Sequence, residues 1–174
     1  MLSVAFFRNV NQGQRGSPSS ARLVEAFELA GGRGVAPFQS NGTVLFDATD
    51  PEGCTRAAVE RLAATSPWSD VAFVRSTEWL LEFMLEFMAE LRSDEAVFGR
   101  SELSLFDESV SPADSLPLTG NRCTVVSGGP GFALTENERA NESNATPTLE
   151  RALGIPVTSR GLPTLSRLVA RLSN

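Results

Sequence analysis

The stretch VAPFQSNGTVLF, residues 35–46, decides the fold that this sequence predicts. It consists of two short β-prone runs around Asn41-Gly42, and an Asn-Gly pair in that setting is the strongest local signal for a β-hairpin. Apolar runs at residues 2–7 and 71–74 are typical of strands, and the segments 18–30 and 47–64 have the apolar spacing of helices. The predicted order of the first half is therefore β-α-β-β-α-β.

That order is the one of the ferredoxin-like split-βαβ motif, whose antiparallel sheet carries both helices on one face. In the second half, the pattern predicts a helix over 76–92, strands over 101–106, 123–126 and 132–134, and closing helices over 147–153 and 163–172. We therefore expect an α+β protein with a ferredoxin-like half at residues 1–75. A second, degenerate α+β half at residues 76–174 is expected to pack on the first and share its core.

Composition excludes several classes of chemistry. The 174 residues contain no His and no Lys, so all 15 positive side chains are Arg. Without His there is no Ser-His-Asp or Cys-His catalysis, and without Lys there is no Schiff base. The sequence predicts no metal site and no cofactor, and it leaves open whether the protein is an enzyme. A net charge of -6 argues against nucleic acid as the partner, because a polyanion is repelled.

The sequence also contains signals that bear on the cellular compartment of the protein. The residues after Met1 lack a positive leader, and no stretch approaches the roughly 18 uncharged apolar residues of a membrane span. Cys54 and Cys123 have no CxxC spacing and are expected to be buried free thiols. We therefore expect a cytoplasmic protein without a membrane partner.

Two polar loops are predicted to meet at one end of the first sheet. In the split-βαβ topology, the loop after the first strand and the hairpin after the second strand lie at the same end. Their amide, hydroxyl and guanidinium groups, with no carboxylate among them, favour an anionic or highly oxygenated small molecule. The alternative is that the amides only satisfy loop backbone groups. The candidate side chains are Arg8, Asn9, Asn11, Gln12 and Arg15 in one loop and Gln39, Ser40 and Asn41 in the other.

A second group of candidates precedes the last helix. Thr158 and Arg160 stand beside Gly161, where they could supply an anion contact at the N-terminus of that helix. The alternative is that this segment is only a helix cap.

The helix predicted over 76–92 carries two patterns. Glu78, Glu82, Glu86 and Glu90 recur at every fourth position and are typical of a solvated face. Apolar residues cover the rest, so the helix is either sandwiched between the two halves or partly exposed for self-association.

Three stretches of the chain resemble the bacterial family catalogued as domain of unknown function 1697. They are Phe-Arg-Asn-Val-Asn at 7–11 with its Gly-containing loop, the hairpin at 39–46, and the segment 149–160. The family usually has Gly at the position of Asn9 and Gly-Asn in place of Asn41-Gly42, so the chain departs from it there. The resemblance implies an α+β protein of ferredoxin-like character with no established activity. By position it implies that any shared site is lined by Arg8, Asn11, Gln39, Ser40, Thr158, Arg160 and Thr164.

These observations support two hypotheses. The first is a cytosolic small-molecule-binding protein, or an enzyme, that holds an anionic ligand through Arg8, Arg160 and the neighbouring donors. The second is an interaction module in which the 76–92 helix or an open sheet edge pairs two chains, so that the protein is a monomer or a homodimer. Phe83→Glu should give folded monomers under the second hypothesis and an unfolded chain if that helix is core.

Overall fold

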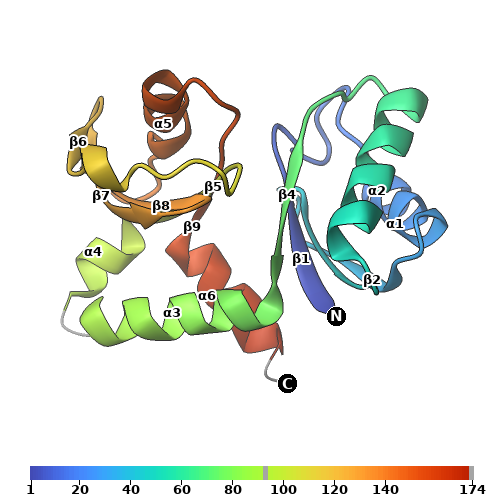
Figure 1. Ribbon diagram of the computed structural model, residues 1–174, viewed down its shortest axis with the longest axis horizontal. Coiled ribbons are helices and arrows are strands. Elements are labelled where there is room, and N and C mark those ends of the chain that lie inside the picture. The colour runs from blue at the N-terminus through green and yellow to red at the C-terminus, as the bar shows by residue number, and fades with distance from the viewer. Residues whose placement is uncertain (92–93, 173–174) are drawn as a thin grey trace. The chain divides into compact units, whose positions relative to one another are not determined.

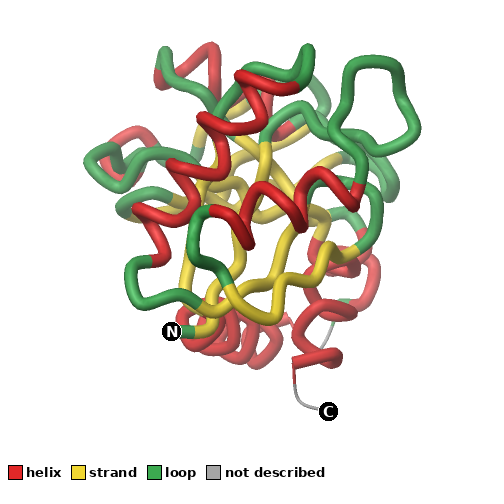
Figure 2. Tube along the Cα trace, turned by 90° about the vertical axis from the view of Figure 1, so that its right-hand side faces the viewer, coloured by secondary structure: helices red, strands yellow, loops and turns green. Residues whose placement is uncertain are grey.

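The computed structural model describes residues 1–91 and 94–172, and the chain divides into two compact units, Met1–Leu80 and Leu81–Asn174. The boundary lies inside helix α3 (Thr77–Leu91), a few residues beyond the boundary predicted between residues 75 and 76. Each unit has its own antiparallel sheet together with helices. Figure 2 distinguishes the helices, strands and loops of the chain by colour. The α+β class is thereby confirmed, whereas the core shared by the two halves stays a prediction.

The elements of the first unit follow one another in the predicted order. The sheet has four strands in the order β2-β3-β1-β4, and every neighbouring pair is antiparallel. Both helices lie on the same side of this sheet (Figure 1). The elements are β1 (Leu2–Phe7), α1 (Ser20–Leu29), β2 (Arg33–Phe38), β3 (Thr43–Asp47), α2 (Pro51–Thr65) and β4 (Ala72–Ser76).

Local signals in the sequence set the helix starts and the core of this unit. The Asp50 side chain accepts a hydrogen bond from the Gly53 N–H at 2.9 Å, which caps the start of α2. The fully buried rings of Phe7, Phe27 and Phe46 lie between the helices and the sheet. The ring centroids of Phe27 and Phe46 are 4.7 Å apart, and those of Phe7 and Phe27 are 5.9 Å apart. Burying such large apolar side chains is the main favourable term in folding.

Strand β2 lies at one edge of this sheet and is irregular. Its register against β3 shifts between Arg33 and Ala36, where Gly34 has φ +58. Pro37, further along the strand, has no backbone N–H to offer a neighbour. The edge strand is thus interrupted twice within six residues.

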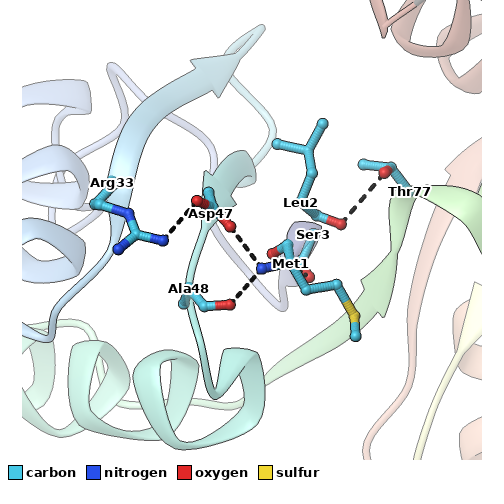
Figure 3. A network of polar contacts seen from close by, with 7 residues as sticks. All are labelled: Met1, Leu2, Ser3, Arg33, Asp47, Ala48 and Thr77. Atoms are coloured by element: carbon cyan, nitrogen blue, oxygen red, sulfur yellow. Dashed lines mark hydrogen bonds and ion pairs between the residues drawn. The ribbon is translucent and has the colours of Figure 1, made fainter.

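A polar network ties the N-terminus to β3 (Figure 3). The amine of Met1 donates to Asp47 Oδ1 and to the Ala48 carbonyl, both at 2.6 Å. Arg33 donates to the other carboxylate oxygen of Asp47 at 2.8 Å. The N-terminal amine and then Arg33 lower the pKa of Asp47 to about 2.

The second unit contains a five-stranded antiparallel sheet in the order β6-β7-β8-β5-β9. Helix α5 lies on one side of this sheet and helices α4 and α6 lie on the other (Figure 1). The short elements α4, β6 and β9 were not predicted, because none is long enough for a periodic pattern. The elements after α3 are α4 (Glu95–Gly99), β5 (Ser101–Leu105), a 3-10 turn (Ala113–Ser115), β6 (Leu118–Thr119), β7 (Cys123–Gly129), β8 (Phe132–Asn137), α5 (Ala145–Leu153), β9 (Thr158–Gly161) and α6 (Leu162–Leu172).

The acidic face of α3 is solvated as predicted, over the part that can be assessed. Glu78, Glu82 and Glu86 are exposed, and the side chain of Glu90 lies outside the described residues.

Several apolar residues of α3 are covered within the chain, over the part whose side chains are described. Leu80 and Met84 are buried. Phe83 stacks on Phe87 at a centroid distance of 6.0 Å and meets Phe132 of β8 edge-on at 5.9 Å. Leu85, by contrast, is 67% exposed. This burial favours the interpretation of α3 as a core helix.

Two further expectations concern the cysteines and the membrane. Cys54 and Cys123 are free and buried, as predicted, and burial raises the pKa of the Cys54 thiol. Among the described helices, none has both the length and the apolar character that crossing a membrane requires.

Candidate functional site

The two polar loops of the first unit lie together, as their topology predicts. The Gln12 N–H donates to the Ser40 carbonyl at 2.8 Å, which joins the loop after β1 to the β2–β3 hairpin. Gly42 has φ +70, and a Cβ at this position would lie 2.6 Å from Cβ of Val10. The approach of the two loops therefore requires glycine here.

A carboxylate lies at this end of the sheet, which corrects the prediction that the cluster has none. Asp70, just before β4, accepts hydrogen bonds from Arg8 Nη1 and from Asn9 Nδ2, both at 2.7 Å. Its other oxygen accepts from the Val71 N–H at 2.9 Å. In the Arg8–Asp70 ion pair the side chains are only 24% and 16% exposed.

These contacts give Arg8 and Asn9 a structural role. Trp68 Nε1 donates to the Arg8 carbonyl at 3.0 Å, and the Arg8 N–H donates to the Val71 carbonyl at 2.9 Å. Both ends of Arg8 are thus fixed to the segment that leads into β4. Sequence reasoning missed Asp70, although β4 is antiparallel to β1, so that the residues before β4 must lie beside those after β1.

Four other candidate side chains of the two loops remain exposed. Asn11, Arg15, Gln39 and Ser40 are exposed, and their side chains make no hydrogen bond or ion pair with any described residue. The Arg8 charge is balanced by Asp70, so Arg15 contributes an unbalanced positive charge to the group. These four residues, called here the loop-donor group, can offer amide, hydroxyl and guanidinium donors to a ligand.

Gln12 and Asn41 lie deeper than the loop-donor group. Both are partly buried, and the Oε1 atom of Gln12 accepts a hydrogen bond from the Ser20 hydroxyl. The Nε2 atom of Gln12 is buried and has no hydrogen-bond partner among the described residues. An unmatched buried donor costs about 1–3 kcal/mol, which folded proteins tolerate mainly at functional positions or where a water is bound.

Thr158 and Arg160 belong to the second unit and lie on a strand. Both are residues of β9, which pairs with β5, so the segment considered as an anion contact or a helix cap before the last helix is a strand. Arg160 Nη1 donates to Thr158 Oγ1 at 2.9 Å and to the Ser159 carbonyl at 2.8 Å. Burial lowers the pKa of Arg160 to about 10. The ten candidate side chains of the two loops and of the segment before the last helix are therefore divided between the two units, eight in the first and two in the second.

Comparison with known proteins identifies the fold. The chain is similar to the solved structure of the conserved bacterial protein SP0830 from Streptococcus pneumoniae, with a TM-score of 0.67 and 18% sequence identity. The match covers 99% of this chain and 98% of that chain. This likeness shows the fold alone. No protein-family model matches the chain, and neither does any curated protein.

Proposed function

We propose that this protein binds an anionic, oxygen-rich small molecule at the end of the first sheet, through the loop-donor group. The supporting observation is the hydrogen bond between Gln12 and Ser40, because it joins the loops that carry Asn11, Arg15, Gln39 and Ser40. Arg15 supplies the positive charge, and a guanidinium binds carboxylate or phosphate oxygens through paired N–H groups.

The roles of Arg8 and Asn9 change within this proposal. Their side chains are bound to Asp70 and hold the loop in place, so they act as positioning residues for the group. Asp70 itself is engaged by three donors. The cluster thus supports binding of a ligand, and the proposal includes no acid-base step.

Three further features of the protein are proposed: its fold class, its family and its cellular compartment. We infer that the first unit is ferredoxin-like, supported by the strand order β2-β3-β1-β4 with both helices on one side. Membership in the bacterial family of unknown function is supported by the motifs at residues 7–11, 39–46 and 149–160. A cytoplasmic location is supported by the two free cysteines, which fit a reducing compartment.

A thermal-shift screen tests the binding proposal. Inorganic phosphate, ATP, glucose 6-phosphate and citrate are each added to the full chain and to its Arg15→Ala variant. A ligand at about a hundred times its dissociation constant adds roughly 2.7 kcal/mol, which moves the midpoint of a chain this size by about 5–10 °C. A tenfold loss of affinity in Arg15→Ala reduces the added stability to about half.

The matched control is Arg56→Ala, which removes another exposed arginine side chain, from α2. We expect this variant to keep the full shift. No shift with any of the four anions overturns the proposal, and so does an equal shift in the wild type and Arg15→Ala.

A further inference from the structure

The second unit contains a pocket of about 320 Å³ that the proposed function does not use. It lies where β5 begins and where β9 passes into α6, and Arg100, Glu102, Glu142, Thr164 and Arg167 are among its lining residues. Its volume is at the lower end of the roughly 300–1,000 Å³ of small-molecule sites.

Glu102 is the unusual residue in this pocket, because its carboxylate is almost fully buried. The residue is only 4% exposed. Its Oε2 atom accepts a hydrogen bond from Asn137 Nδ2 at 2.8 Å and one from the Ala145 N–H at 3.3 Å. No donor among the described residues is hydrogen-bonded to its Oε1 atom. A buried carboxylate is stabilised by several hydrogen-bond donors, and Glu102 Oε1 can accept a hydrogen bond from one more.

The strand beside Glu102 has a second unused polar group. Thr135 of β8 pairs directly with Glu102 of β5. The Thr135 hydroxyl is fully buried and has no hydrogen-bond partner among the described residues. The β5–β8 pair therefore carries two groups that can form further hydrogen bonds, Glu102 Oε1 and the Thr135 hydroxyl.

The charges of the lining residues indicate the chemistry of an occupant. Arg100 is paired with Glu136 at 3.3 Å, and Glu142 is paired with Arg122. Glu102 and Arg167 form no ion pair with any residue in the described ranges.

Arg167 is exposed and donates to Thr164 Oγ1 at 3.2 Å. The pocket thus offers one negative and one positive side chain that the protein does not neutralise.

We propose that this pocket binds a zwitterionic small molecule, namely a free α-amino acid. The ammonium group donates to Glu102 Oε1, and the carboxylate accepts from the guanidinium of Arg167. Each contact joins opposite charges, so a molecule that carries only one of the two groups satisfies only half of the site.

The test is isothermal titration calorimetry of the full chain with each proteinogenic amino acid in turn. For any amino acid that binds, its N-acetyl derivative lacks the ammonium group and its amide lacks the carboxylate. We expect each derivative to bind at least about tenfold more weakly, since a hydrogen bond to a charged group contributes roughly 1.5–3 kcal/mol.

Two arginine variants separate binding from folding. Arg167→Ala should lose at least about tenfold in affinity, whereas Arg171→Ala, an exposed position one turn further along α6, should bind like the wild type. Glu102→Gln can also unfold the second unit, because Glu102 anchors the start of α5, so the derivatives test its contact independently. Absence of binding by every amino acid overturns the proposal, as does equal binding by the acetylated or amidated forms or by Arg167→Ala.

Discussion

Replacing Asp70 by Asn should loosen the loop that carries the proposed binding group. Asn has nearly the same shape and can still accept from the Val71 N–H, but it lacks the negative charge that faces Arg8. A hydrogen bond to a charged group contributes about 1.5–3 kcal/mol and an exposed ion pair only about 0.2–1 kcal/mol. With side chains 24% and 16% exposed, the Arg8–Asp70 pair lies between these cases. We therefore expect Asp70→Asn to lower the free energy of unfolding by about 1–3 kcal/mol.

A double-mutant cycle in urea isolates the ion pair. Arg8→Met keeps much of the apolar stem, so the cycle formed by Arg8→Met, Asp70→Asn and the double variant should give a coupling energy of about 1–2 kcal/mol. Asn9→Gly is a useful comparison, because Asn9 has φ 54 and glycine accepts that conformation without strain. Its cost then reports the amide contact with Asp70 together with the backbone entropy that glycine adds. Effects of Arg8→Met and Asp70→Asn that add to within about 0.3 kcal/mol refute the reasoning.

Three other substitutions test separate parts of the structure. Gly42→Ala should destabilise the chain by about 1–3 kcal/mol in urea, since it clashes with Val10, whereas Gly13→Ala has φ +92 but open space around it and should cost less. The wild type should lose stability as pH falls from about 4 towards 2, because the pKa of Asp47 is about 2 in the folded protein, below the ordinary aspartate value of 3.8. Asp47→Asn should abolish that loss, and parallel curves of stability against pH for both proteins over that range contradict this. Phe83→Glu should lower the free energy of unfolding by about 2–4 kcal/mol. If light scattering shows instead that the wild type is a dimer and that Phe83→Glu is a stably folded monomer, the result supports the interface hypothesis.

The parts of the fold that the sequence predicted are those with strong local signals. Asn41-Gly42 between two β-prone runs located the β2–β3 hairpin, and the glycine is needed there for the conformation and for space. The strand Thr158–Gly161 was missed because four residues show no reliable alternation, and its pairing with β5 is set by contacts distant in sequence. The backbone of Asn9 was not predicted either: it is left-handed, with φ 54, and a single Asn in a polar loop does not indicate that conformation.

The candidate site was predictable in its location but not in its internal bonding. Topology alone brought the loop after β1 to the hairpin, and the hydrogen bond between Gln12 and Ser40 is the result. Which arginine keeps an unbalanced charge depends on a single neighbour. Asp70 forms an ion pair with Arg8 and leaves Arg15 available, and only the folded structure gives that distinction. Glu102 was overlooked because a lone Glu in a strand has no sequence signature of burial.

The irregular edge strand β2 affects how the protein behaves at high protein concentration. A regular, unpaired strand edge is a template on which other chains add strands, and this is how amyloid-like aggregates grow. The register shift at Arg33 and the missing N–H of Pro37 interrupt that template on one side of the first sheet. In the second sheet the edge strands β6 and β9 have only two and four residues, too few to hold an added strand firmly. These three edges of the folded protein therefore disfavour aggregation by strand addition at high concentration.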